Sequence, residues 1–143
     1  MSNYTMDKVY SITDINGIGA YLVVVQGPNA GECRLPYEAN GDKILGVTVY
    51  SQSMHGGYVA VRKAGIARVV AEGKIELGEP VIVAGITGRV IQCPKTRQEA
   101  IDKGFFDDSE PMSKFNVLGF AEIAASADGD VIEVFISIHQ RTV

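Results

Sequence analysis

One stretch of this chain is written twice. The first copy, "ILGVTVYSQSMHGGYVAVRKA", covers residues 44–64, and the second, "VLGFAEIAASADGDVIEVFIS", covers residues 117–137. The two copies align from end to end without a gap. Identical residues stand at five aligned positions: Leu45 and Leu118, Gly46 and Gly119, Ser53 and Ser126, Gly56 and Gly129, and Val61 and Val134. Each copy is typical of a strand, a loop with serine and glycine, and a returning strand. The sequence therefore predicts a β fold with an internal two-fold repeat.

The residue composition points in the same direction. Valine and isoleucine together number 31, against 5 leucines, and β-branched side chains favour strands over helices. Sixteen glycines fit many tight turns. About eight short strands follow one another at close spacing, the pattern of a small β-barrel or sandwich. The expected fold class is all-β.

Residues 94–115 interrupt the strand pattern and are expected to be an insertion. Thr96 can cap a helix, Glu99 lies three residues further on, and Gly104 can end it. One short helix is therefore expected near residues 95–104. The rest of residues 20–143 is expected to form a single β domain.

Residues 1–19 are polar and weakly patterned, so we expect an N-terminal arm or an edge segment. Such a segment can dock on a partner or cover a sheet edge of its own subunit, and both alternatives stay open. The last strand, "DVIEVFISI", is apolar on one face and half apolar on the other, which suits a contact with another layer or subunit. The candidate interface residues are Tyr4, Met6, Val9, Tyr10 and Ile12 at the N-terminus, and Val131 and Phe135 in the last strand.

The charge pattern argues against two classes of partner. The formal net charge is −4 and no run of lysine and arginine occurs, so we expect no nucleic-acid partner. The longest apolar run, Ala20–Val25, is far shorter than the roughly 20 residues that span a bilayer, and no signal pattern opens the chain. We therefore expect no membrane partner and synthesis in a cytoplasm.

The residue types that carry catalysis are sparse. Cys33 and Cys93 stand in no C-x-x-C pattern, and they and the two histidines, His55 and His139, have no metal-ligand spacing. We expect no catalytic residue, no cofactor and no metal. An enzyme that pairs Cys33 or Cys93 with a histidine remains an alternative, because such partners meet only in the fold.

The residues from Gly41 to Ile91 and from Asn116 to Ser137 resemble a known family. The phrases "ILGVTVYS", "YVAVRKAG", "LGEPVIVAGITGRVI" and "NVLGFAEIAASADGDVIEVFIS" are similar to those of the head-decoration, or capsid cement, proteins of tailed bacteriophages. The resemblance implies a virion protein on the outer capsid surface that binds the assembled shell, commonly as a homotrimer, and stabilises it by bridging neighbouring capsomers. It implies the major capsid protein and further copies of this chain as partners. A β module that binds a small ligand or a glycan is the other alternative.

Overall fold

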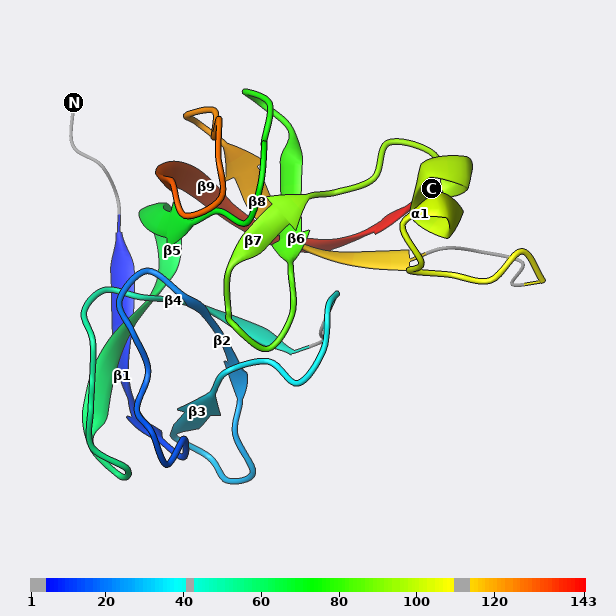
Figure 1. Cartoon of the computed structure of the whole chain (residues 1–143). Coiled ribbons are helices and arrows are strands. Elements are labelled where there is room, and N and C mark those ends of the chain that lie inside the picture. Colours follow the sequence, from blue (N-terminus) through cyan, green and yellow to red (C-terminus); the bar gives the residue numbers. More distant parts are fainter. Residues whose placement is uncertain (1–4, 41–42, 110–113) are drawn as a thin grey trace.

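The computed structural model describes residues 5–40, 43–109 and 114–143. These residues form nine strands and one short helix (Figure 1). In chain order the elements are β1 (Met6–Ile12), β2 (Val23–Gln26), β3 (Glu32–Arg34), β4 (Ile44–Thr48), β5 (Tyr58–Val70), β6 (Pro80–Val83), β7 (Val90–Gln92), α1 (Arg97–Asp102), β8 (Lys114–Ala121) and β9 (Val131–Thr142). The all-β prediction is confirmed.

The first five strands close into a barrel, called the first barrel here. Their order is β1-β3-β2-β4-β5, and β1 also pairs with β5, which completes the ring. β1 is antiparallel to β5 and parallel to β3. The interior is filled by Tyr10, Ile12, Ile18, Val24, Cys33, Val59 and Val61. The N-terminal strand is therefore part of the barrel wall, and its inward side chains are part of the core.

The second half of the chain repeats this arrangement and is called the second unit. The β4–β5 pairs Val47↔Arg62 and Thr48↔Val61 recur at the aligned positions of the second copy as the β8–β9 pairs Phe120↔Phe135 and Ala121↔Val134. The β2–β3 pairs Val25↔Arg34 and Gln26↔Cys33 recur in the same order as the β6–β7 pairs Ile82↔Ile91 and Val83↔Val90. The repeat seen in the sequence is thus a repeat of strand register, and it extends to strands that show no obvious sequence similarity.

Strand β5 belongs to both halves. Its first half pairs with β1 and β4, and its second half, Gly65–Val70, pairs antiparallel with β9. Ile12 pairs in parallel with Cys33, and Ala71, just past β5, pairs in parallel with Val90. The amides of Gly56 and Gly129 donate to the carbonyl oxygens of Ile12 and Ala71, respectively, at 3.0 and 2.8 Å. The second half of β5 therefore takes in the second unit the place that β1 takes in the first barrel.

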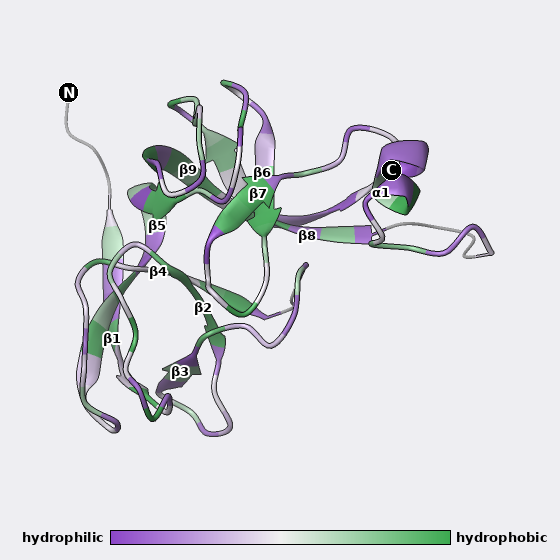
Figure 2. Cartoon of the chain, in the orientation of Figure 1, coloured by the Kyte–Doolittle hydropathy of each residue, from purple (hydrophilic) through white to green (hydrophobic). Residues whose placement is uncertain are grey.

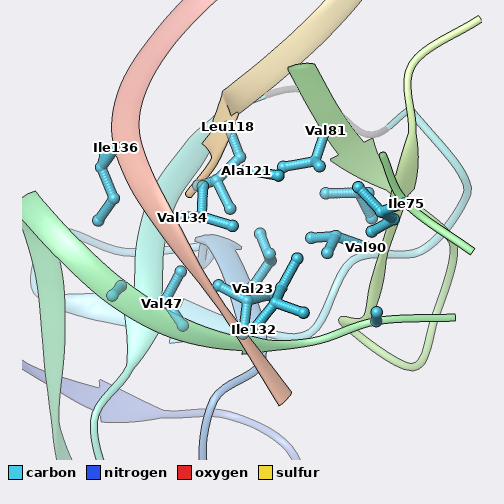
Figure 3. Packing of buried hydrophobic residues seen from close by; sticks show 14 of the residues in the cluster. Val23, Val47, Ile75, Val81, Val90, Leu118, Ala121, Ile132, Val134 and Ile136 are labelled. Atoms are coloured by element: carbon cyan, nitrogen blue, oxygen red, sulfur yellow. The ribbon is translucent and has the colours of Figure 1, made fainter. Parts of the chain in front are cut away.

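The two halves share one buried cluster. Figure 3 shows Val23 and Val47, which point out of the first barrel, packed with Ile132, Val134 and other core residues of the second unit. Burial of such side chains contributes roughly 1.5–3 kcal/mol each. This shared cluster joins the halves into one body.

The predicted helix is present and covers the second unit. The Thr96 hydroxyl accepts a hydrogen bond from the Glu99 amide at 3.1 Å, so the cap expected from the sequence starts α1. Ala100, Phe105 and Phe106 pack with Phe115 and Val117 of β8. Figure 2 shows that α1 is otherwise largely hydrophilic. Val117 of β8 is the repeat equivalent of Ile44 of β4. Ile44 packs against the second unit in the shared cluster, whereas Val117 packs beneath α1. In the second unit, the insertion thus takes the place that the second unit itself takes beside the first barrel.

Candidate functional site

The two cysteines lie in the protein interior and are separated in the fold. Cys33 is in the core of the first barrel, and Cys93 packs beneath α1. Burial raises the pKa of the Cys33 thiol to about 12 and that of Cys93 to about 11. A nucleophilic cysteine needs an accessible thiolate, so this environment is unfavourable for cysteine chemistry.

Neither histidine is placed as a general base beside these thiols. His55 is exposed in the loop between β4 and β5. His139 lies on β9, where its ring stacks on Phe120 with a centroid distance of 5.6 Å. Its Nδ1 is 2.6 Å from the Ser137 carbonyl oxygen, so Nδ1 carries the hydrogen. The prediction of a protein without catalytic residues remains a prediction.

The part of the chain that the structure describes contains no group of three or more histidine, cysteine, aspartate or glutamate side chains able to hold a metal ion. Within the same residues, no helix is long and apolar enough to cross a membrane.

The candidate interface residues separate into two groups. Met6, Val9, Val131 and Phe135 are exposed on the outer faces of β1 and β9, with Val9 56% and Phe135 46% accessible. Tyr10 and Ile12 are only 3% and 1% accessible, and they face the barrel interior. The prediction that they contact a partner is therefore corrected, because they are unreachable while the barrel is folded. Tyr4 lies outside the described residues.

Phe135 lies in a row of apolar side chains across three strands. Ile66 of β5 and Phe120 of β8 are its direct neighbours in the strand register, on either side of β9. His139 extends the row through its stack on Phe120. We call Ile66, Phe135, Phe120 and His139 the Phe135 row. Such cross-strand pairs stabilise a sheet, and the exposed ring edge also offers apolar contact to a partner.

The equivalent positions of the first barrel carry charge instead. Asp7 and Arg62 pair directly across β1 and β5, where the second unit has Ile66 and Phe135. The Arg62 guanidinium donates to both carboxylate oxygens of Asp7, at 2.9 and 3.2 Å. Hydrogen bonding to Asp7 is the main reason that the pKa of Arg62 is raised. The two halves therefore share their strand register but differ in their outer surface.

A groove of about 380 Å³ runs beside this ion pair where the two halves meet. Arg62, Ile66, Arg68 and Glu133 line it together with Thr5 and Val49. Among the described residues, its lining includes no histidine or cysteine. The groove offers polar and apolar contacts of mixed character.

A second cleft, of about 390 Å³, lies at the loop end of the first barrel. The Arg34 guanidinium lies 3.4 Å above the ring of Tyr37, and both line the cleft with Asp14. The Asp14 carboxylate accepts the Leu35 amide at 3.3 Å, and burial raises its pKa despite this hydrogen bond. An exposed tyrosine beside a carboxylate and a guanidinium is an arrangement that can contact a polar ligand.

The comparison with known proteins supports the architecture described above. No protein-family model matches the chain, and no curated protein matches it. Among solved structures, the fold is similar to the N base of the head fiber gp8.5 of bacteriophage phi29. The match has a TM-score of 0.57 and 19% sequence identity, and it covers 94% of this chain and 95% of the other. At this identity the likeness shows a shared fold.

Sequence reasoning named Phe135 but missed the other members of the Phe135 row and the Asp7–Arg62 pair. The repeat alignment held part of the signal, because it sets Phe120 against Val47 and Phe135 against Arg62. Two aromatic residues at positions where the other copy has valine and arginine indicate a different surface. Their partner Ile66 could not be found this way, because the equivalence of β1 with the second half of β5 follows only from the pairing of strands.

Proposed function

We propose that this chain is a structural protein of a bacteriophage head, which binds the outside of the assembled capsid and stabilises it by bridging neighbouring capsomers. The observation that carries the proposal is the fold likeness to the base of a phage head fiber over nearly the full length of both chains. The family resemblance of the repeated phrases supports the same assignment independently.

The surface of the molecule is compatible with this role. Apolar side chains are exposed on the outer faces of β1 and β9 and at the loop end of the first barrel, where Ile15, Met54 and Tyr58 lie open to solvent. We propose that these exposed apolar side chains contact protein partners, as contiguous apolar surface commonly does. We propose the major capsid protein and further copies of this chain as the partners, with a homotrimer as the working form on the shell.

Binding to assembled heads tests the proposal. Purified chain is mixed with heads from the phage that encodes it, prepared without the protein, and sedimented. We expect saturable binding to assembled shells, added density on the outer surface by electron microscopy, and retention of DNA to a higher temperature. Absence of binding to intact heads at micromolar concentration would overturn the proposal. Density from isolated monomers, away from three-fold positions, would overturn the trimer alone.

The cleft at Asp14, Arg34 and Tyr37 favours one other candidate, a module that binds a small polar ligand or a glycan. Titration of the chain with mono- and oligosaccharides, followed by NMR, separates the two. Shifts confined to this cleft, together with no binding to heads, would favour the ligand-binding module.

A further inference from the structure

Strand β9 has one edge that is paired along only half of its length. Residues Val131–Ile136 pair with β5, whereas the β8 pairing continues to Thr142. Among the described residues, no backbone hydrogen bond joins Ile138–Thr142 to any strand other than β8. The C-terminal half of β9 is therefore an edge strand.

The direction of the free backbone groups follows from the alternation along β9. The Asp130 carbonyl accepts the Ala71 amide on the β5 side, and the Glu133 carbonyl accepts the Glu122 amide on the β8 side. Since successive residues of a strand point their backbone groups to opposite edges, even-numbered residues up to Ile136 face the β5 side. Beyond the register shift near Gly119, the backbone groups of Lys114 and Asn116 bond the Asn40 side chain and so point away from β9. Their pairing partners Thr142 and Gln140 therefore point away from β8 in the same way, and so does Ile138, two residues before Gln140. Ile138, Gln140 and Thr142 thus present their N–H and C=O groups to the open edge.

The internal repeat shows what such an edge accepts in this fold. β9 is the repeat equivalent of β5, and the second half of β5 corresponds to the open half of β9. In β5 this half is covered by six residues of an antiparallel strand, from Gly65↔Ile136 to Val70↔Val131. The open edge is thus continuous with an interface already formed within the molecule, and its equivalent is filled by a strand.

The edge is also held firmly in place. A two-stranded ribbon alone is marginally stable. Here the Asn40 side chain bonds both the Lys114 carbonyl and the Asn116 amide of β8, at 2.9 and 2.8 Å. Phe105 and Phe106 pack edge-to-face on Phe115 at 5.4 and 5.2 Å. Asn40 and the insertion therefore support the two-stranded ribbon of residues 114–117 and 139–142. This support pre-organises the free edge of the ribbon for binding.

We propose that the edge formed by Ile138, Gln140 and Thr142 binds an extended segment of the capsid shell protein as an added antiparallel strand. This inference rests on the proposed function and names the contact that carries it. Main-chain hydrogen bonds supply affinity in strand addition, and alternate side chains supply selectivity. The segment that fits has an apolar residue opposite Ile138, which is 44% accessible, and an acidic or uncharged residue opposite Arg141.

A second copy of this chain fits the edge less well. Antiparallel self-pairing centred on Gln140 would set Arg141 of each copy opposite His139 of the other. In this register no acidic side chain meets Arg141, whereas an opposite charge placed across from it would stabilise the strand pair. The charge of the edge thus favours a different polypeptide.

Backbone substitution at the edge tests the proposal. Gln140→Pro removes an edge-facing N–H and is compatible with an edge strand, whereas the matched control Gln140→Ala keeps the N–H. Thr142→Pro and Thr142→Ala form a second pair near the strand end. Binding to heads is measured by sedimentation, and folding by thermal unfolding. We expect each proline variant to fold and to bind heads at least about tenfold more weakly, with both alanine variants within about twofold of wild type.

Amide exchange of the free protein provides the second measurement. The amides of Ile138, Gln140 and Thr142 should exchange rapidly, and head binding should protect them. Wild-type affinity in both proline variants would overturn the strand addition while leaving the proposed function intact. A concentration-dependent dimer that the proline variants abolish, with head binding retained, would assign the edge to a second copy and overturn the shell segment. Failure of the wild-type chain to bind heads would overturn both proposals.

Discussion

Gly119 lies directly against the carbonyl oxygen of Phe135 on the neighbouring strand, as Gly46 lies against that of Arg62. A side-chain Cβ at either glycine would collide with backbone atoms, which cannot move aside as a flexible side chain can. Both glycines are also flanked by a shift in strand register. The identical glycines in the two copies are therefore explained by the close approach of two strands.

Gly46→Ala and Gly119→Ala are expected to destabilise the fold by about 2–3 kcal/mol each, because the added methyl group overpacks a rigid contact. Urea unfolding monitored by circular dichroism measures the loss. Gly85→Ala is the matched control, since an added Cβ there meets no atom within 4 Å, and its effect should stay within about 0.5 kcal/mol. Equal effects at all three positions would contradict this explanation.

The N-terminal strand should prove essential for folding. Tyr10→Ala removes a buried ring whose hydroxyl accepts a hydrogen bond from the Lys63 ammonium at 2.8 Å, and we expect a loss of about 3–5 kcal/mol. Val9→Ala, on the exposed face of the same strand, should cost less than about 1 kcal/mol. Thermal unfolding compares the two variants.

Removal of residues 2–12 extends the same test. Because β1 closes the first barrel, we expect a large fall in the melting temperature. A truncated chain that keeps its melting temperature but no longer binds heads would show instead that the segment is a capsid tether.

Asp14 should make stability depend on pH. Burial raises its folded-state pKa above 3.8, so the folded protein holds the proton more tightly than the unfolded chain. Its contribution to the free energy of unfolding is therefore greatest below that value and falls as the pH rises through the folded-state pKa. Asp14→Asn keeps an acceptor for the Leu35 amide and removes the titration. The variant should gain stability relative to wild type between about pH 3 and about pH 6, measured by urea unfolding. A difference that stays constant over this range would rule out Asp14 as the source.

The thiols should be inert in the folded protein. With a pKa of about 12 for Cys33 and about 11 for Cys93, almost no thiolate exists near pH 8. An aromatic disulfide reagent is expected to react slowly with the native chain and rapidly after unfolding in guanidinium. Cys33→Ala and Cys93→Ala should each keep head binding, at a packing cost of roughly 1–3 kcal/mol. Fast labelling of a native cysteine, coupled to loss of a measurable turnover, would revive the enzyme alternative.

Several features of this protein could be predicted because their causes are local in the chain. The excess of valine and isoleucine over leucine indicates strands, and the Thr96–Glu99 spacing indicates where α1 begins. The gapless internal repeat predicted two similar strand-loop-strand units, and β4–β5 and β8–β9 confirm it with matching registers. These signals come from side-chain shape and from hydrogen bonds between close neighbours in sequence.

Other features were decided by contacts between residues far apart in the chain. Closure of the first barrel by β1, the sharing of β5 between both halves and the unpaired edge of β9 all depend on which strands meet. The same strand pattern allows Tyr10 to face a partner or a core, and only the pairing of β1 with β5 turned it inward. A shift of one residue in register would reverse every side chain of that strand. The apolar residues Val9, Tyr10 and Ile12 fall on both of its faces, so the local pattern does not fix the register. Local sequence therefore specifies the elements and their repetition, whereas long-range pairing determines which of their faces and edges remain available for binding.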